Sequence, residues 1–333
     1  MKKLKGKVIG VLAWGILFFQ ILSSNGLATT EKNYPSRAVE IIVPWGPGSN
    51  ADVIARMINP HLERYFKQPF VVVDKSGGAG IIAHNYVANA KPDGYTILSL
   101  NSIYGGLLAT RKPSELKFNF ESFIPVVGYA ATHVYFNIRK EAPWKNLPEF
   151  IEEARKNPGK MKFASTAVFA SAHIFATDLF KRAGVKVTHI PAKGSGDAVT
   201  ALLGGHVDMA VIHGSIGHAA GGTVRVLAVA AEERRPDLPD APTLKELGYP
   251  IARPSVVGLA VPNGTSREIV DQLYQAVREI IQANQEGLKT NLLKIEALLT
   301  LMDPNRYLEL CKADKEYFFK MVPEIKKELG VRD

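Results

Sequence analysis

Two polar segments of the sequence have the residue types of an anion-binding helix start. The first reads PWGPGSNAD at residues 44–52 and follows a run of β-branched residues. Gly48 suits the turn, and Ser49 or Asn50 can cap the helix that follows. Asp52 falls in the first turn, where the helix dipole favours a carboxylate. The free N–H groups of this helix start, with the Ser49 and Asn50 side chains, can hold an anionic group of a ligand. An ordinary N-cap in a tight connection explains the same residues, so both interpretations stay open.

The second segment reads FASTAVFASAH at residues 163–173 and leads from a short predicted strand into a helix. Ser165, Thr166 and Ser171 supply hydroxyl groups, and the helix start supplies free N–H groups. We therefore expect a second anion-holding loop that faces the first. His173 falls in the first turn of this helix. Its side chain is interpreted either as a ligand contact or as a group that fixes the loop, and the sequence does not decide between them.

A glycine-rich loop, SGGAG at residues 76–80, follows the second predicted strand. It lacks both the Gly-x-Gly-x-x-Gly order of a dinucleotide site and the Gly-Lys-Ser/Thr ending of a P-loop. A nucleotide is therefore a poor candidate ligand. We interpret this loop, with Gly78, as a flexible source of backbone donors beside the first segment.

The sequence contains no recognisable catalytic or metal-binding set. No Gly-x-Ser-x-Gly or His-Glu-x-x-His motif occurs, and the eight histidines show no metal-ligand spacing. The single cysteine, Cys311, excludes an intramolecular disulfide and a cysteine-based metal site. Cys311 falls on an apolar helical stripe, which predicts a buried hydrophobic residue. We therefore predict no catalytic residues and no metal site.

The first 28 residues have the order of a secretory signal peptide. Four lysines precede an almost unbroken apolar run over residues 8–22, and GLA at 26–28 places small residues where a signal peptidase cleaves. Cleavage after Ala28 would release the mature chain into the periplasm. A retained membrane anchor is the alternative, although the run is short for a bilayer span and no cysteine follows it for lipid attachment.

Composition and charge exclude several other classes of protein. With 46% hydrophobic and 22% charged residues, the chain can build a core, which argues against a disordered protein. It carries 41 Lys and Arg against 32 Asp and Glu, and four of those lysines belong to the predicted signal. The mature chain is therefore mildly basic, which suits small anionic ligands. Its basic residues are scattered and not interleaved with aromatic residues, so nucleic acid is a poor candidate partner.

Short β-branched runs alternate with amphipathic segments, which is typical of α/β proteins with mostly parallel strands. At two extended stretches, 126–139 and 253–262, the chain is predicted to cross from one half of the protein to the other. Such a chain would form two lobes joined by a hinge, with the loops at the carboxyl ends of the strands facing a central cleft. Strands are predicted at residues 39–43, 70–73, 96–100, 126–129, 134–138, 185–190, 207–212, 224–230 and 258–261.

Five motifs in one order make the chain recognisable. They are YPSRAVEIIVPWGPGSNAD at 34–52, QPFVVV at 68–73, KPDGYT at 91–96, LGGHVD at 203–208 and LPDAPT at 238–243. Together they resemble the extracytoplasmic substrate-binding proteins of tripartite tricarboxylate transporters, also called the Bug family, over essentially the whole mature chain. The resemblance implies a two-lobed, type II-like periplasmic-binding-protein fold that closes on a small carboxylate. It also implies no cofactor, no catalysis, and delivery of the ligand to a pair of membrane permease subunits, one large and one small.

Carried over by motif, the first carboxylate-binding loop of the family falls on Trp45 to Asp52, and the opposing loop falls on Ala164 to His173. The strand-end positions of the family fall on Asn101 and Ser102, and on His213 and Ser215. The second loop departs from the family by being poorer in Gly and Ser, and it contains Phe169. With Trp45, Phe169 suggests a ligand that has an apolar or aromatic body behind its carboxylate.

We therefore expect a secreted, monomeric solute-binding protein with lobe 1 at residues 34–132 and 258–333 and lobe 2 at 133–257. Two other functions remain as alternatives. A sensory protein that presents its liganded form to a receptor kinase would use the same lobes, and neighbouring permease genes would distinguish it from a transport protein. A hydrolase that uses the cleft is disfavoured by the missing nucleophile arrangement, and turnover of a bound carboxylate would reveal it.

Overall fold

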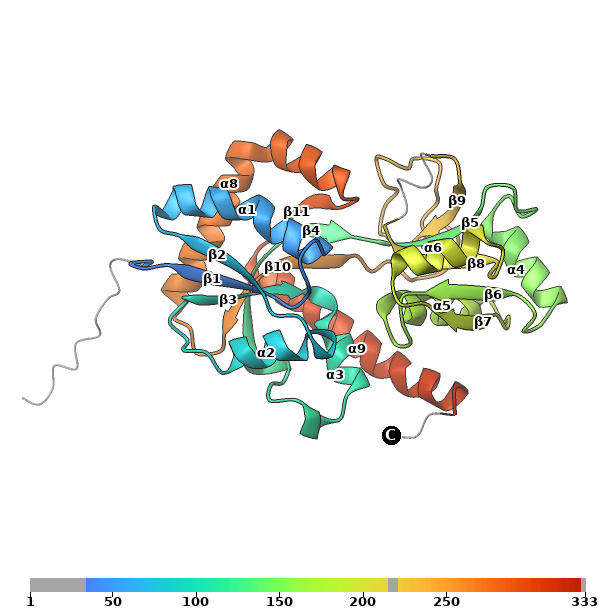
Figure 1. The fold of residues 1–333 in the computed structure, drawn as a ribbon, viewed down its shortest axis with the longest axis horizontal. Helices are drawn as coiled ribbons and strands as arrows, with labels where there is room; N and C mark the ends of the chain where they lie inside the picture. The colour runs from blue at the N-terminus through green and yellow to red at the C-terminus, as the bar shows by residue number, and fades with distance from the viewer. Residues whose placement is uncertain (1–33, 215–220, 331–333) are drawn as a thin grey trace, which may run out of the picture. The chain divides into compact units, whose positions relative to one another are not determined.

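The computed structural model describes residues 34–214 and 221–330 of the chain (Figure 1). The predicted signal peptide, residues 1–28, and the predicted site residue Ser215 lie outside the described residues. Over the described ranges, no helix combines the length and the apolar character that a membrane span requires.

The chain divides into two compact units, Met1–Ser36 and Arg37–Asp333. The described part of the first unit is residues 34–36, where the peptide bond between Tyr34 and Pro35 is cis. Over the described residues, the second unit contains two β-sheets and all of the helices.

The first sheet has six strands in the order β11-β4-β10-β3-β1-β2 (Figure 1). Strand β1 pairs in parallel with β2 and β3, whereas β10 is antiparallel to β3 and β4, and β11 is antiparallel to β4. The strands are β1 (Val39–Val43), β2 (Phe70–Asp74), β3 (Thr96–Asn101), β4 (Phe123–Thr132), β10 (Ser255–Pro262) and β11 (Leu298–Met302).

Most strands of this sheet agree with the sequence-based expectation. Those predicted at 39–43, 70–73 and 96–100 are confirmed, and β4 and β10 extend beyond the predicted 126–129 and 258–261. Strand β11 escaped prediction because its short apolar run directly follows a long helix, where periodicity does not separate a strand from a helix end.

The helices of the first sheet are α1 (Asn50–Phe66), α2 (Ile81–Ala88), α3 (Gly105–Thr110), α8 (Arg267–Lys294) and α9 (Pro304–Glu328). Four short 3₁₀ turns accompany them: η1 (Gly78–Gly80), η2 (Ser102–Tyr104), η3 (Pro113–Glu115) and η4 (Phe120–Ser122). Helices α1 and α2 each follow a parallel strand, so both begin at the carboxyl edge of the sheet.

The second sheet has five strands in the order β7-β6-β8-β5-β9. Strand β6 is parallel to β7 and β8, and β5 is antiparallel to β8 and β9. The strands are β5 (Val134–Arg139), β6 (Lys162–Ser165), β7 (Thr188–Pro191), β8 (Met209–His213) and β9 (Val224–Val229), and the helices are α4 (Leu147–Lys156), α5 (Ser171–Arg182) and α6 (Ser195–Leu203). Strand β7 begins at 188 and not at the predicted 185, because the Val185 N–H closes the end of α5 on the Phe180 carbonyl at 3.0 Å.

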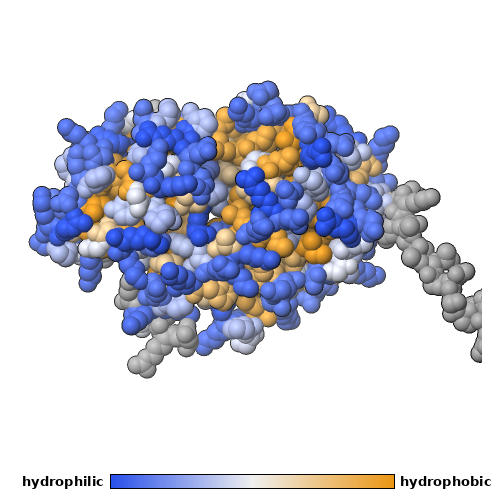
Figure 2. All heavy atoms as spheres, turned by 180° about the vertical axis from the view of Figure 1, so that it is seen from behind, coloured by the Kyte–Doolittle hydropathy of each residue, from blue (hydrophilic) through white to orange (hydrophobic). Residues whose placement is uncertain are grey.

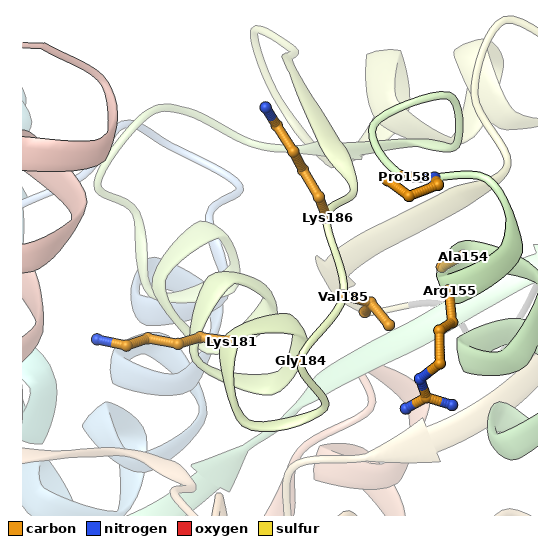
Figure 3. A pocket seen from close by; sticks show the side chains of 7 residues that line it. All are labelled: Ala154, Arg155, Pro158, Lys181, Gly184, Val185 and Lys186. Atoms are coloured by element: carbon orange, nitrogen blue, oxygen red, sulfur yellow. The ribbon is translucent and has the colours of Figure 1, made fainter.

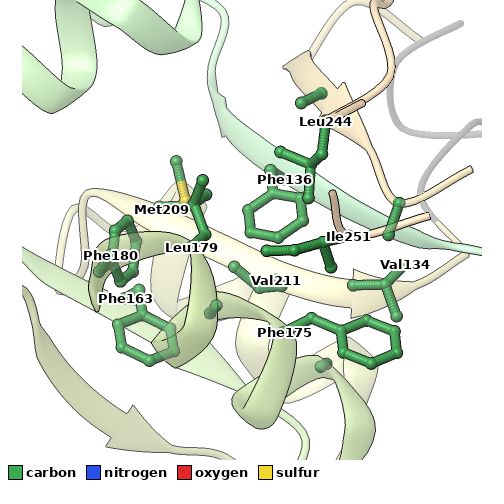
Figure 4. Packing of buried hydrophobic residues seen from close by; sticks show 14 of the residues in the cluster. Val134, Phe136, Phe163, Phe175, Leu179, Phe180, Met209, Val211, Leu244 and Ile251 are labelled. Atoms are coloured by element: carbon green, nitrogen blue, oxygen red, sulfur yellow. The ribbon is translucent and has the colours of Figure 1, made fainter. Parts of the chain in front are cut away.

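An aromatic-rich cluster forms the core of the second sheet (Figure 4). Phe163, Phe180 and Phe136 are among its fully or nearly fully buried members. Burial of such side chains stabilises the fold by about 1.5–3 kcal/mol each. On the face shown in Figure 2, hydrophilic residues cover most of the surface and hydrophobic residues show between them in several places.

Helix α9 packs against both sheets. Tyr307 and Cys311 in its first half belong to the core cluster of the first sheet. Phe318 and Val322 in its second half belong to the cluster of the second sheet. Cys311 is fully buried, which confirms its predicted role as a hydrophobic core residue.

The chain passes between the two sheets twice. Strand β4 continues into β5 with only His133 between them, and the chain returns between Ile251 and the start of β10. These passages lie in or next to the predicted crossings 126–139 and 253–262. Since α9 also joins the sheets, the boundaries of the two lobes stay a prediction.

A buried ion pair reinforces the first crossing. Arg235 is 1% exposed, and its guanidinium makes two hydrogen bonds to the carboxylate of Asp237 at 2.9 and 2.8 Å. A third nitrogen of Arg235 lies 3.1 Å from Nδ1 of His133. Burial, with the nearby Arg235 charge, lowers the pKa of His133 to about 3, so the ring is neutral and accepts this bond.

Candidate functional site

The carboxyl ends of three strands of the second sheet lie near His213. Strands β6, β7 and β8 are parallel neighbours, so their carboxyl ends lie at one edge of the sheet. Helix α5 begins with Ser171 after β6, α6 begins with Ser195 after β7, and His213 ends β8. Ser171 Oγ lies 3.0 Å from Nε2 of His213, and Ser195 Oγ donates to the His213 carbonyl at 3.2 Å.

The start of α5 is open to an anion. Its N-cap residue, Ala170, makes no side-chain capping bond, and the first turn holds no acidic residue. The first intrahelical bond runs from the Ile174 N–H to the Ala170 carbonyl at 3.0 Å, so the N–H groups of residues 171–173 precede the helical ladder. These donors and the positive end of the helix dipole favour a bound negative charge.

The start of α1 is already occupied by its own side chains. Ser49 Oγ accepts from the Asp52 N–H at 3.3 Å, and the Asp52 carboxylate accepts from the Gly48 N–H at 2.8 Å. The same carboxylate lies 2.5 Å from Nε of Arg56 and is 3% exposed. Asp52 therefore holds the loop in shape and supplies the negative charge that the helix start favours. An anionic ligand meets fewer free donors here than at α5.

The exposed part of the α1 loop is nevertheless accessible. Trp45 is 43% exposed, and Gly48 and Asn50 are exposed as well. Gly48 has φ of 78°, a left-handed conformation that favours glycine. These groups can line a ligand-binding site, whereas Asp52 contributes only indirectly, by holding the loop in shape.

The glycine-rich loop lies next to the α1 loop. A Cβ added to Gly80 would lie 3.3 Å from Cβ of Pro44, so the two loops are in contact. Residues 77–80 all have positive φ, and Nδ1 of His84 bonds to the Gly80 carbonyl at 2.8 Å. Gly78 is exposed in this loop, as its predicted role as a backbone donor requires.

The predicted site residues at the end of β3, Asn101 and Ser102, bond to other protein groups. Asn101 Oδ1 accepts from the Ile103 N–H at 3.2 Å and from the Ser255 hydroxyl at 2.8 Å. Ser102 is fully buried, and its Oγ accepts from the Val256 N–H at 3.2 Å. In this conformation, Ser102 ties β3 to the crossing strand β10 and does not reach the surface.

The loop before α5 is fixed by a pair of stacked histidines. Nδ1 of His173 accepts from the Phe169 N–H at 3.0 Å, and the His173 and His189 rings are 4.0 Å apart. Ser165 Oγ lies 2.8 Å from Nε2 of His189. Burial lowers the pKa of His173 to about 3, with a further contribution from His189, and burial lowers the pKa of His189 to about 4. The two rings are therefore neutral, and His173 fixes the loop.

The remaining residues of this loop differ in exposure. Thr166 and Phe169 are half-buried, and Val168 is 41% exposed. Phe169 has φ of 63° and packs against the core cluster of the second sheet. The packing of Phe169 against this core accounts for part of the apolar character of the loop, so a ligand is not needed to explain it.

The sequence reasoning missed two members of this site. His189, which bonds to Ser165, and Ser195, which bonds to His213, both come from the segment HIPAKGSGD at 189–197. Helix α6 has Gly194 as its N-cap residue and makes no side-chain capping bond there. The Gly-Ser-Gly run shortly after a predicted strand was the signal for this second helix start, where Asp197 already supplies a carboxylate in the first turn.

A separate hollow of about 340 Å³ lies at the opposite end of α5 (Figure 3). Lys181, Gly184 and Lys186 line it together with Arg155 from α4. Lysine and arginine are ordinary residues at helix C-termini, where they complement the negative end of the dipole. Among the described residues, no group of three or more His, Cys, Asp or Glu side chains is placed to hold a metal ion.

Comparison with known proteins finds relatives over most of the chain. The sequence matches the profile described as "Tripartite tricarboxylate transporter family receptor" over residues 54–296. Protein BugT of Bordetella pertussis is 33% identical over 256 residues, which span 75% of this chain and 78% of BugT. A TctC solute binding protein from Polaromonas has a TM-score of 0.78 and 27% identity, covering 87% of this chain and 99% of its own. MatC from Rhodopseudomonas palustris, solved with bound malate, has a TM-score of 0.70 and 27% identity, covering 87% of this chain and 100% of its own.

Proposed function

The chain belongs to the receptor family of tripartite tricarboxylate transporters, the Bug family, and from this premise we propose that it captures a small organic carboxylate outside the cytoplasm. Its two sheets form the two-lobed α/β fold of solved solute-binding proteins of this family, as the sequence predicted. The relative solved with malate supports a carboxylate as the class of ligand.

The observation that carries this proposal is the open start of α5. Its N–H groups have no capping side chain and no carboxylate in the first turn, in contrast to the start of α1. A ligand carboxylate placed there gains charge-assisted hydrogen bonds, which contribute about 1.5–3 kcal/mol each. Ser171 begins α5, and the start of α6 neighbours it because Ser171 and Ser195 both contact His213.

Binding on this scheme closes the two lobes by population shift. The loops of lobe 1, with Trp45, Gly48, Asn50 and Gly78, would meet the ligand from the side opposite α5. A ligand that contacts both lobes stabilises the closed form by its difference in affinity for the two forms. Phe169 and Trp45 would contact any apolar body behind the carboxylate.

Membership of the family supports a proposal for the partners and the location. We place the mature, monomeric protein in the periplasm after cleavage near Ala28, where it delivers its ligand to the large and small permease subunits of a tripartite transporter. It performs no catalysis in this role. Recovery of the unchanged acid after prolonged incubation with the protein distinguishes binding from hydrolysis.

A charge placed at the α5 start tests the site. In Ala170→Asp, the new carboxylate caps the free N–H groups and repels a ligand carboxylate. The helix gains about 0.5–2 kcal/mol from the cap, while calorimetric affinity for mono- and dicarboxylates should fall at least tenfold. The matched control is Asn146→Asp, which adds a carboxylate at the N-cap of α4 in the same lobe. Helix α4 follows β5, which is antiparallel to β8, so α4 begins at the other edge of the sheet.

Ligand screening on the wild type completes the test. A panel of carboxylates should raise the melting temperature, whereas neutral sugars should not. At 100 times the dissociation constant, a ligand stabilises the folded state by about 2.7 kcal/mol. Stabilisation by sugars alone, or undiminished carboxylate binding in Ala170→Asp, would refute the proposal.

A further inference from the structure

One arginine of α1 bonds to the roots of both first-sheet loops that are proposed to meet the ligand. Nε of Arg56 lies 2.5 Å from Oδ1 of Asp52, one helical turn earlier in α1. Nη2 of Arg56 lies 3.0 Å from Oδ2 of Asp74, the last residue of β2 and 18 residues further along the chain. We call these three side chains the Arg56 bridge. They join the start of α1 to the end of β2.

Each carboxylate of the Arg56 bridge lies at the root of one of the two loops. The second oxygen of Asp52 accepts from the Gly48 N–H at 2.8 Å, which holds the α1 loop. Asp74 leads into the glycine-rich loop at residues 76–80. The two loops also contact each other directly. A change in the bridge is therefore expected to reach both loops.

The two carboxylates are buried, and Asp74 depends on the arginine. The side chains of Asp52 and Asp74 are 4% and 13% exposed, whereas that of Arg56 is 51% exposed. Oδ1 of Asp74 is buried and has no hydrogen-bond partner within the described ranges. Burial, with the nearby Asp52 carboxylate, raises the pKa of Asp74, and the bond from Arg56 opposes that rise. Since a half-exposed ion pair adds little to global stability, we expect the effect of the bridge to be local to the loops.

We propose that Arg56 is a positioning residue for ligand binding, which holds the α1 loop and the glycine-rich loop in the arrangement that receives the carboxylate. This inference rests on the proposed function and adds a residue that the sequence analysis did not single out. The charge of the bridge opposes this role, because two carboxylates and one guanidinium leave one excess negative charge beside the loops. Geometry and charge therefore predict opposite effects of removing the Asp74 side chain.

Two substitutions of Asp74 separate geometry from charge. Asp74→Ala breaks the bridge and removes a negative charge, whereas Asp74→Asn removes the same charge and keeps an oxygen that can accept from Arg56. Malate, adipate and benzoate are titrated by calorimetry. For each acid that the wild type binds, Asp74→Ala should lower the affinity about tenfold, the effect of losing roughly one hydrogen bond between the ligand and the protein. Asp74→Asn, the conservative variant, should recover most of that affinity.

Trp45 reports on the α1 loop without any ligand. Trp45 and Trp144 are the two tryptophans that follow the predicted signal peptide, so Trp144→Phe leaves Trp45 alone in the mature chain. In that background, acrylamide should quench Trp45 fluorescence more strongly in Asp74→Ala than in the parent, because the loop has lost its tie. Asp74→Asn should be quenched like the parent. A merely structural role would lower the urea midpoint of Asp74→Ala and leave the quenching of the folded protein unchanged.

Asp93→Ala is the matched control for an ion pair and a negative charge lost from the same sheet. Asp93 pairs with Arg37 at 3.1 Å. Arg37 precedes β1 and Asp93 precedes β3, and these two strands are parallel, so the pair lies at the sheet edge opposite the two loops. The control should change neither the affinity nor the quenching of Trp45.

The outcomes separate this inference from the proposed function. Unchanged or tighter binding in Asp74→Ala would overturn the positioning role of Arg56 and leave the carboxylate function standing, and so would equal losses in Asp74→Ala and Asp74→Asn. Unchanged quenching of Trp45 in Asp74→Ala would overturn it as well. Failure of all three acids to bind the wild type would count against the proposed function, and the Trp45 measurement would then uphold or overturn the bridge by itself.

Discussion

The stacked histidine pair before α5 should make the folded protein sensitive to mild acid. The pKa of His173 is lowered by burial and by His189 to about 3, whereas a histidine in an unfolded chain titrates near 6.5. As the pH falls below 6.5, the unfolded chain binds a proton that the folded protein does not. Folding stability is therefore lost progressively, until the pH reaches the folded pKa.

The substitution His173→Asn isolates this contribution. Oδ1 of asparagine falls near the position of Nδ1, so it can still accept from the Phe169 N–H. The asparagine does not titrate. One histidine with these two pKa values removes about 2 kcal/mol of unfolding free energy between pH 6.5 and 4.5, at about 1.4 kcal/mol per pH unit once the unfolded histidine is charged. The variant should lose that part of the pH dependence, although the missing ring lowers its stability at neutral pH.

Urea unfolding at pH 6.5, 5.5 and 4.5, followed by circular dichroism, measures the effect. The quantity to compare is the change in unfolding free energy with pH, in the wild type and the variant. His206→Asn, at an exposed position of the same lobe, controls for the loss of a histidine. Equal pH slopes in the wild type and His173→Asn would refute the reasoning, because they would mean that His173 takes up its proton without unfolding.

Four further single substitutions and one double change have definite expected outcomes. Asp237→Ala should lower the unfolding free energy by about 3–5 kcal/mol in urea titrations, because it leaves the buried Arg235 charge without its carboxylate. The double change Arg235→Met and Asp237→Leu should recover most of that loss. If the double variant recovers none of it, the explanation is contradicted. Gly258→Ala should prevent folding or lower the melting temperature severely, since its Cβ would lie 1.9 Å from a carbonyl oxygen of β4. Gly287→Ala, in an open position on α8, should instead raise the unfolding free energy by up to about 1 kcal/mol. Tyr317→Phe removes a 2.9 Å hydrogen bond from α9 to a buried carboxylate on α5 and should destabilise by about 1–3 kcal/mol in the same assay; an unchanged midpoint would show that this bond does not contribute.

Short-range features of this protein could be predicted from the sequence because their causes lie within a few residues. The strands at 39–43 and 70–73 have β-branched runs bounded by turn residues, and Ser49 caps α1 through an N–H three residues away. The burial of Cys311 follows from the helical spacing of its apolar neighbours. The order of five motifs also led to the family, since it depends on the linear sequence alone.

Only the tertiary structure decided what the polar side chains at the candidate site do. Ser171 and His213 are 42 residues apart, and Arg235 and His133 are 102 apart, so no local pattern could pair them. Ser102 was expected at the ligand and is buried against β10, because the antiparallel pairing of β10 with β3 covers it. A serine hydroxyl donates or accepts according to the group opposite it, and strand register determines that group. The sequence by itself therefore determined the class of protein and the candidate loops, while the packing of the second sheet decided which groups Ser171 and Ser195 contact.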